Sequence, residues 1–384
     1  MNSDQRLLEC QRDLFAIPES VAFFNCANVG PLMRPALAAG QLSYERRAQP
    51  WRIDSEDWFG DVERRRALFA SLVGVAADNV ALVSAASYGL AIAARNLRIS
   101  PAKKVLVLDE DFPSNVYTWR RYCSHYGSEL LTVRREAGQE WTEAVLGGLD
   151  ERIGIVAVPN VHWTDGAMLD LRAISARARA VGARLVVDAS QSLGMLPLDF
   201  AAVRPDFVVT VGYKWLLGPY GLAYLYVADE HLEGEPLEEN WVGREGSEDF
   251  ARLVDYRDEY RTGARRFDVG ERAFFEATRA AIAVLEKLAG WGCARISATL
   301  ADKVARILAA ATQLGFTPTT RGARAPHMLG LALPRGIDDV AARMRERNVY
   351  VSVRGSAMRI SPHVYNSDGD IAVLTSALAT LVPG

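Results

Sequence analysis

Seven short apolar runs, separated by longer amphipathic stretches, constrain the fold of this chain more than any other feature. Each run is long enough for one buried strand, and the intervening stretches leave room for helices. Strands that are buried on both faces read as continuous apolar runs, which is typical of a mainly parallel sheet covered by helices. The sequence therefore predicts an α/β fold with a seven-stranded, mainly parallel sheet and helices on both faces. The runs are 80–85, 104–109, 129–134, 153–159, 184–189, 207–212 and 221–227.

The composition agrees with a soluble globular protein and excludes several classes of partner. Of the 384 residues, 49% are hydrophobic and 24% are charged, and the net charge is −3. Because nucleic acids and anionic membranes are bound by concentrated positive charge, we expect neither as a partner. No apolar run approaches the roughly 20 residues of a membrane helix, and the N-terminus lacks a signal-peptide core, so we expect a cytoplasmic protein.

The cysteines indicate neither a disulfide framework nor a metal centre. Cys10, Cys26, Cys123 and Cys293 are widely spaced, without a C-x-x-C or Cys/His ligand pattern. We therefore expect four reduced thiols and no bound metal.

A lysine follows the apolar run 207–212 almost directly. Lys214 stands between Tyr213 and Trp215, and a glycine-rich turn comes after them. Burial disfavours a charged ammonium, so a lysine in this position loses its proton readily and can form an imine with an aldehyde cofactor. The candidate cofactor is pyridoxal phosphate.

The preceding apolar run ends in a carboxylate, Asp188, at the edge where ligands bind in open α/β sheets. Pyridoxal phosphate requires an acid against its pyridine nitrogen, because the protonated ring is the electron sink. We expect Asp188 to fill this role and Gln191 to hydrogen-bond the ring's phenolic oxygen. Taken singly, Asp188 could cap a loop and Lys214 could extend from a strand end to solvent, but the ordered pair on successive strands favours the cofactor site.

Two short motifs carry a resemblance to a known family. Residues 187–191 (Val-Asp-Ala-Ser-Gln) resemble the Asp-x-x-Gln element of the class V aminotransferase and cysteine desulfurase family of fold-type I pyridoxal phosphate enzymes, and 212–214 resemble its Gly-His-Lys element with tyrosine for histidine. The likeness runs through most of the chain. Through 112–117 and 218–221 it is nearest to the isopenicillin N epimerase-like branch.

The resemblance implies a division into two domains, on a boundary that composition does not mark. It implies a large cofactor-binding domain over 15–265 and a small α+β domain over 266–384, with the segment 1–30 contributing to the active-site region. We expect a linking helix over 271–288, ended by Gly290. Apolar periodicity predicts a helix over 169–181 ended by Gly182. The remaining expected elements are helices near 294–313, 337–347 and 368–381 and strands near 327–333 and 348–360.

The resemblance also implies a homodimer with its active site near the interface. Residues 263–271 resemble a segment that relatives contribute across the dimer, where many have a Gly-Thr pair that touches the partner's phosphate. Glu271 replaces the threonine. A carboxylate would repel a phosphate, so the phosphate role is not carried over to Glu271.

Five further residues are implied by position to bind the cofactor: Ala86, Ser87, Phe112, Trp163 and Tyr213. At the strand-to-helix turn 84–90 the family usually carries two threonines. Ala86 and Ser87 stand there, and Ser87 is the expected phosphate ligand unless it is a simple N-cap. Tyr213 is expected to donate its hydroxyl to the same phosphate. Phe112 matches the aromatic residue over the pyridine face unless it is a core residue, and Trp163 stands where many relatives have an asparagine near the cofactor.

Three residues are expected to contact the substrate. Arg359 matches the family's Arg-x-Ser...Tyr-Asn element, and a planar guanidinium suits an α-carboxylate, although a salt bridge inside the small domain is the alternative. Asn28 is expected to join it from the N-terminal segment. His162 is either substrate-facing or structural, since Lys214 is available as the base.

The reaction is left open among several chemistries that share removal of the substrate's α-proton by Lys214. Cysteine desulfurases of the family place a nucleophilic cysteine on a loop shortly before the carboxylate arginine, and 351–358 contain none, which disfavours desulfuration. We expect an aminotransferase acting on an amino acid or related amine, with a β-eliminating C–S lyase or an epimerase as alternatives. The intact Lys214 and Asp188 argue against a non-catalytic binding protein, and the lack of a G-x-G-x-x-G pattern argues against a Rossmann dehydrogenase.

Overall fold

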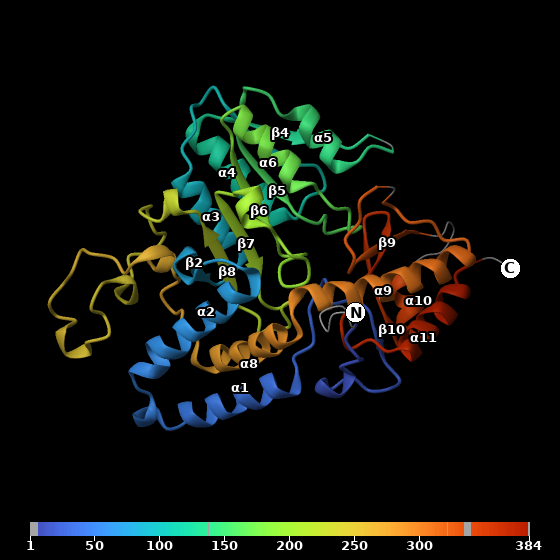
Figure 1. Cartoon of the computed structure of the whole chain (residues 1–384), viewed down its shortest axis with the longest axis horizontal. Helices are drawn as coiled ribbons and strands as arrows, with labels where there is room; N and C mark the ends of the chain where they lie inside the picture. Colours follow the sequence, from blue (N-terminus) through green and yellow to red (C-terminus); the bar gives the residue numbers. More distant parts are fainter. Residues whose placement is uncertain (1–6, 137, 321, 334–338, 383–384) are drawn as a thin grey trace.

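The computed structural model describes residues 7–136, 138–320, 322–333 and 339–382. It has a large domain built around a seven-stranded sheet and a smaller α+β domain, which lies to the right in Figure 1. This arrangement is the α/β architecture expected from the sequence.

The seven apolar runs form the seven strands of one sheet. Their order is β2-β8-β7-β6-β5-β3-β4, and β8 alone among them runs antiparallel to its neighbours β7 and β2. The mainly parallel sheet expected from the sequence is therefore confirmed. The strands are β2 (Val80–Val83), β3 (Lys104–Leu108), β4 (Glu129–Val133), β5 (Ile153–Pro159), β6 (Arg184–Asp188), β7 (Phe207–Val211) and β8 (Ala223–Val227).

Helices cover both faces of this sheet, which explains why its strands lack polar alternation. Leu106, Val156 and Val187 point into one apolar core, while Val105 and Val186, one residue along their strands, point into the other. Both sets are buried. The helices of the large domain are α1 (Arg34–Arg47), α2 (Asp61–Val73), α3 (Ala86–Asn96), α4 (Pro113–Tyr126), α5 (Trp141–Gly148), α6 (Leu171–Ala180) and α7 (Phe200–Val203).

The helix predicted over 169–181 corresponds to α6. Asp170 caps its first turn by accepting the N–H groups of Arg172 and Ala173. The chain turns away at Gly182, whose φ of 73° is left-handed. Both ends of the helix therefore have the signals that the sequence suggested.

The long linking helix differs from its prediction at both ends. Helix α8 (Phe275–Trp291) begins after the expected start and continues through Gly290, because the left-handed position that ends it is Gly292, with a φ of 79°. It packs along α1 (Arg34–Arg47) and α2 of the large domain (Figure 1). The expected linking helix therefore packs with the large domain, and the boundary at 265/266 stays a prediction.

The small domain has a three-stranded antiparallel sheet in the order β11-β12-β9. The strand region expected over 348–360 is divided into three short strands, with a turn at Gly355, whose φ is 54°. The strands are β9 (Leu329–Ala332), β10 (Val349–Tyr350), β11 (Ser352–Arg354) and β12 (Ala357–Ile360), and the helices are α9 (Cys293–Gln313), α10 (Val340–Arg345) and α11 (Asp368–Ala379). Part of the helix expected over 337–347 lies outside the described residues.

The N-terminal segment crosses to the small domain before it enters the large one. Strand β1 (Ala22–Phe23) pairs in parallel with β10, and Asn25 forms a bridge with Ser361. Residues 22–25, which the expected boundary assigned to the large domain, therefore pack with the small domain. Within the described part of the chain, no helix combines the length and apolar character needed to cross a membrane.

Candidate active site

Lys214 lies just beyond the carboxyl end of β7, in a buried environment lined by aromatic rings. Lys214 is only 7% exposed. Its Nζ lies 5.1 Å from the ring centroid of Phe112 and 5.9 Å from that of Tyr213. Burial lowers the pKa of Lys214 to about 8; the Asp188 carboxylate opposes this shift, and the charges of Arg359 and Arg354 add to it. A fraction of the amine is therefore neutral near physiological pH.

Asp188 is the last residue of β6 and lies beside this lysine because β6 and β7 are neighbours. In the parallel register Asp188 faces Val209, so the carboxyl ends of both strands meet at one edge of the sheet. The Oδ1 atom of Asp188 accepts the N–H of Ser190 at 2.9 Å, which fixes the carboxylate. Lys214 and Asp188 are thus brought to one site, as predicted.

Both residues line a cavity of about 220 Å³ at the carboxyl-terminal edge of the sheet. The loops after β2, β3, β6 and β7 and the turn before β8 all contribute to it, which is where ligands bind in open α/β sheets. The lining residues are Ser84, Ala85, Ala86, Ser87, Phe112, Ser114, Asp188, Ser190, Val211, Tyr213, Lys214, Tyr220 and Gly221.

One end of the cavity is formed by the start of helix α3. Ala85 holds the N-cap position without a side-chain cap bond, so Ser87 is not the N-cap. The first N–H groups of a helix have no partner within the helix and attract anions. Ala86 and Ser87 lie in this first turn and border the cavity. Among the described residues, the buried Oγ of Ser190 has no hydrogen-bond partner.

These features fit pyridoxal phosphate. A helix N-terminus and the unpaired hydroxyl of Ser190 suit the phosphate and ring substituents, while a carboxylate and a buried lysine suit the ring nitrogen and the aldehyde. Tyr213 lies within the cavity, with its ring centroid 4.6 Å from that of Tyr220. Sequence reasoning missed Ser190 and Tyr220, although Ser190 is only two residues beyond Asp188 on the same sheet edge.

Phe112 is the N-cap residue of α4 and presents its ring to the cavity, so it is not simply a core residue. The preceding residue, Asp111, holds it there by accepting the Phe112 N–H at 2.6 Å and the Nδ2 of Asn115 at 2.7 Å. Burial raises the pKa of Asp111 to about 7, although the Asn115 hydrogen bond opposes the shift. Sequence reasoning did not single out Asp111.

Two predicted cofactor residues lie outside the cavity lining. Gln191 accepts the Nε1–H of Trp215 at 2.8 Å and donates from Nε2 to the carbonyl of Ala27 at 3.2 Å. Trp163 donates from Nε1 to the carbonyl of Glu110 at 2.7 Å, and its ring meets that of Phe112 edge-on at 5.5 Å. The direct cofactor contacts of Gln191 and Trp163 therefore stay predictions.

The predicted substrate residue Arg359 lies close to the lysine but belongs to the small domain. It is 1% exposed, and its Nη1 donates to the carbonyl of Trp163 at 2.6 Å. Burial lowers the pKa of Arg359 to about 9, and the charge of Arg354 adds to this shift. The alternative salt bridge inside the small domain is not found among the described residues.

Asn28 lies at the same side of the site, where its Oδ1 accepts a hydrogen bond from Arg354 at 3.3 Å. Arg354 was not predicted. It has no motif of its own, and only the fold of the β11–β12 hairpin brings it to Asn28 and Trp163.

His162 is not brought to the lysine cavity. Its ring stacks on Trp141 with 5.0 Å between centroids, and its Nδ1 is 2.8 Å from the hydroxyl of Thr164. Burial lowers the pKa of His162 to about 4, so the ring is neutral at physiological pH. The structure therefore supports the structural alternative for His162 over a substrate-facing role.

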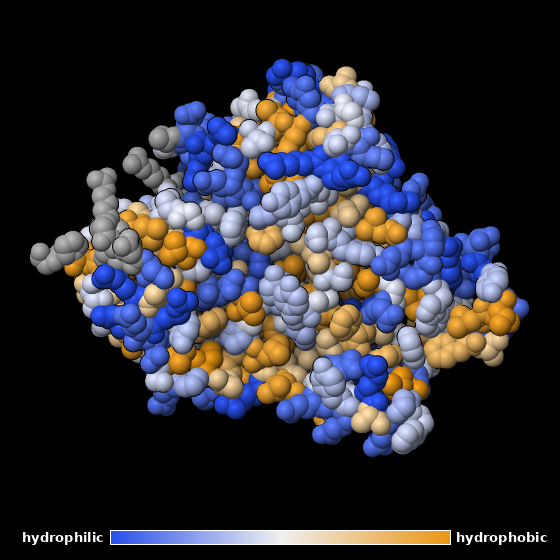
Figure 2. Space-filling model, turned by 180° about the vertical axis from the view of Figure 1, so that it is seen from behind, coloured by the Kyte–Doolittle hydropathy of each residue, from blue (hydrophilic) through white to orange (hydrophobic). Residues whose placement is uncertain are grey.

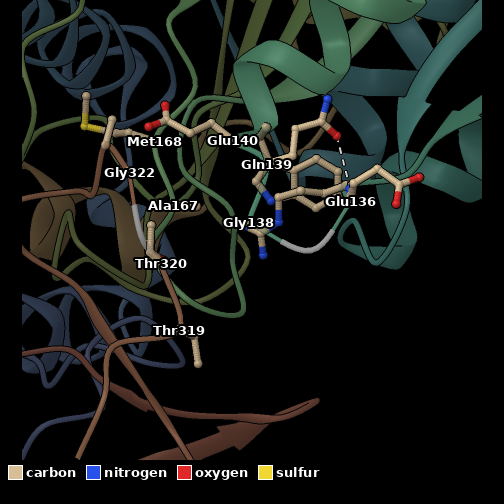
Figure 3. Close-up of a pocket in the computed structure, with 12 residues that line it drawn as sticks. Glu136, Gly138, Gln139, Glu140, Ala167, Met168, Thr319, Thr320 and Gly322 are labelled. Atoms are coloured by element: carbon tan, nitrogen blue, oxygen red, sulfur yellow. Dashed lines mark hydrogen bonds between the residues drawn. The ribbon is translucent and has the colours of Figure 1, made fainter.

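Trp141 also borders a second cavity, of about 270 Å³, between the large-domain loop after β4 and the loop before β9 of the small domain. Figure 3 shows Glu136 and Glu140 on the first loop and Thr319 and Thr320 on the second. Neither Lys214 nor Asp188 contributes to this cavity.

Comparisons with known proteins agree with this geometry. The sequence profile described as Aminotransferase class-V matches residues 55–374. An uncharacterized aminotransferase, YcbU of Bacillus subtilis, is 29% identical over 94% of this chain and 95% of its own length. Isopenicillin N epimerase of Streptomyces clavuligerus is 27% identical over 96% of this chain and 97% of its own length.

Solved structures of C-DES, described as a cystine C–S lyase, have the same fold. A C-DES mutant with glycine covalently linked to the pyridoxal phosphate cofactor gives a TM-score of 0.88 at 19% identity, covering 97% of this chain and 99% of the other. A C-DES complex with its product, cysteine persulfide, gives a TM-score of 0.87 at 19% identity, covering 95% and 99%.

Proposed function

The chain belongs to the class V aminotransferase family, which makes it a pyridoxal phosphate enzyme that acts on amino acids, and on this premise we propose that it is an aminotransferase. The observation that carries the proposal is the presence of Lys214 and Asp188 in one cavity, with Arg359 beside it. When bound, pyridoxal phosphate supplies an electron sink for the electron pair left at the substrate's α-carbon.

The chain's own residues account for the remaining requirements. Arg359 binds the substrate's α-carboxylate and so orients the α-carbon, because a planar guanidinium matches a carboxylate. Lys214, with a pKa lowered to about 8, accepts the α-proton and returns it at a new position. With the cofactor bound, Asp188 would stabilise a proton on the ring nitrogen, and Phe112 would pack against the ring.

A nucleophilic cysteine has no place in this scheme. Cys26, the cysteine near the site, is buried, and its thiol lies 3.7 Å from the backbone carbonyl of Lys214. Burial raises the pKa of Cys26 far above its usual value, which leaves an unreactive thiol. The β11–β12 hairpin, which carries Arg359, has no cysteine. This supports a reaction without a persulfide on the enzyme.

A β-eliminating C–S lyase is the second candidate, because the fold also matches a cystine C–S lyase and the same α-proton would be removed. An epimerase is a third, because of the relative with that activity. The three reactions differ in the position to which Lys214 delivers the proton and in the loss of a β-substituent. That difference depends on small displacements of the reacting atoms.

The experiment that tests the proposal is product analysis of the purified holoenzyme with a panel of amino acids, with and without a keto-acid acceptor. An aminotransferase forms a new amino acid and a new keto acid only when the acceptor is present. Pyruvate and ammonia formed without an acceptor would establish a lyase instead, and conversion of the L-isomer to the D-isomer would establish an epimerase.

We also propose a homodimer and a cytoplasmic location. The dimer is supported by apolar side chains on the segment around Val254 and Tyr256, which projects from the large domain. Val254 is 77% exposed and Tyr256 is 96% exposed. Figure 2 shows apolar surface on this projecting segment at its right edge. Such patches mark interaction surfaces. Sedimentation analysis of the holoenzyme should give twice the mass of one chain; a fully active monomer would overturn the proposal.

A further inference from the structure

Two arginines of the small domain converge on one tryptophan beside the catalytic lysine. Arg359 donates to the carbonyl of Trp163, and the guanidinium of Arg354 lies 5.7 Å from the centroid of its indole ring. Trp163 in turn contacts Phe112, whose ring lies against Lys214. Arg354 and Arg359 are therefore linked to Lys214 through Trp163 and Phe112.

The hairpin places the two arginines on the same face of its sheet. In the antiparallel register Arg359 faces Ser352, and Arg354 is two residues beyond Ser352 on the same strand. Residues two apart in a strand share a face, so Arg354 and Arg359 are diagonal neighbours, with backbones roughly 7–8 Å apart. Ser352 lies between them, and its buried Oγ has no partner among the described residues.

Neither arginine has a carboxylate partner in the part of the chain that the structure describes. Arg354 donates to the Val353 carbonyl at 2.8 Å and to Asn28, both of which are neutral. The Nε of Arg359 is buried and unpaired. Elsewhere the buried Arg66 does have a counter-ion, Asp268, at 2.6 Å. Two unpaired like charges this close repel each other, and anionic ligand groups would relieve that repulsion.

We infer that Arg354 is a second anion-binding residue and that the substrate is an amino acid with an acidic side chain, whose α-carboxylate binds Arg359 and whose side-chain carboxylate binds Arg354. Ser352 is placed to donate its hydroxyl between them. The two arginines are diagonal neighbours on one face of the hairpin, a separation that two carboxylates joined by a short carbon chain can span. This inference rests on the proposed function, because it assumes an amino acid at Lys214.

The test compares acidic amino acids with their neutral isosteres. Dissociation constants of the holoenzyme for L-aspartate, L-asparagine, L-glutamate and L-glutamine are measured by titration calorimetry and by changes in the visible spectrum. In the wild type at least one acid should bind about tenfold or more tightly than its amide, since removing one member of a desolvated charge pair weakens binding by that much or more.

Arg354→Gln should remove most of this preference, while Arg354→Lys should keep part of it. Arg359→Ala should weaken the acid and the amide alike, because both have an α-carboxylate. Arg345→Gln is the matched control: it removes an exposed arginine of the same domain, on α10, and should keep the wild-type preference. A wild type without any preference, or an Arg354→Gln variant that weakens acid and amide by the same factor, would overturn the inference.

The design separates this inference from the proposed function. Arg354-dependent binding of acidic amino acids without formation of a keto acid would refute the aminotransferase proposal and leave the inference standing. Transamination of neutral amino acids that is insensitive to Arg354→Gln would refute the inference and leave the aminotransferase proposal standing.

Discussion

The ammonium of Lys214 lies 5.1 Å from the ring centroid of Phe112, which begins a helix roughly a hundred residues earlier in the chain. The contact joins the loop after β7 to the loop after β3, across the width of two intervening strands. It places an amine, an aromatic ring and the carboxylate of Asp188 around one small cavity. The site therefore combines groups from the ends of β3, β6 and β7, which lie far apart in the sequence.

Replacement of the lysine should abolish covalent attachment of the cofactor. Lys214→Ala removes the amine that lines the cavity, so borohydride reduction followed by peptide mass spectrometry should find no adduct, whereas the wild type should carry one on Lys214. The variant should still bind pyridoxal phosphate reversibly, because the α3 N-terminus and Asp188 remain. An adduct on any other lysine of the wild type would refute the assignment.

Asp188→Asn should keep the fold and slow the removal of the substrate's α-proton. The neutral amide no longer stabilises a proton on the ring nitrogen, so exchange of that α-proton in deuterated water should fall by about 100-fold or more, or roughly 2.7 kcal/mol in barrier height. Unaltered exchange, measured by proton NMR, would show that the carboxylate does not serve the ring.

The depressed pKa of Lys214 predicts a pH-dependent stability of the cofactor-free protein. The pKa falls from 10.5 to about 8 on folding, so between these values the unfolded state binds more protons and the free energy of unfolding rises with pH. Below pH 8 the buried charge lowers the free energy of unfolding by about 3 kcal/mol, since each pH unit by which the pKa is lowered corresponds to about 1.4 kcal/mol.

Lys214→Met should therefore stabilise the cofactor-free protein at pH 7 by up to about 3 kcal/mol, and by little at pH 10. Urea denaturation at both pH values measures the difference. An advantage of the variant that does not change with pH would contradict the lowered pKa.

Gly30→Ala should damage the site from the N-terminal segment. A Cβ at Gly30 would lie 2.3 Å from the carbonyl oxygen of Lys214 and 2.9 Å from Leu217, so the lysine loop would have to shift. We expect weaker pyridoxal phosphate binding and a loss of stability of about 1–3 kcal/mol, the range for overpacking. Thermal denaturation and cofactor titration measure both.

Gly147→Ala is the control for this substitution. Gly147 lies within α5, and a Cβ there would meet no atom within 4 Å. Alanine is the better helix former, so the control should be neutral or slightly stabilising. Equal behaviour of the two variants would show that the contact with Lys214 does not constrain the loop.

Local patterns were sufficient to predict the sheet and the centre of the site. Apolar runs predict buried strands directly, and polar residues at strand ends such as Asp188 and Lys214 must meet at one edge of a parallel sheet. The direction in which a loop side chain points, by contrast, could not be predicted from local patterns. His162 turns toward Trp141, more than twenty residues earlier, and no local signal indicates that stacking. Arg354 was missed because its role depends on how a hairpin docks against another domain.

The path of the N-terminal segment has a mechanical consequence. Its backbone is bonded to the small domain at Cys26, whose N–H donates to Ser361, and to the lysine loop at Gly30, whose N–H donates to the carbonyl of Tyr213. Only three residues separate these two attachments, so the stretch of chain between them can change its length very little. A rotation of the small domain, and of the arginines it carries, would therefore pull on the loop of Lys214.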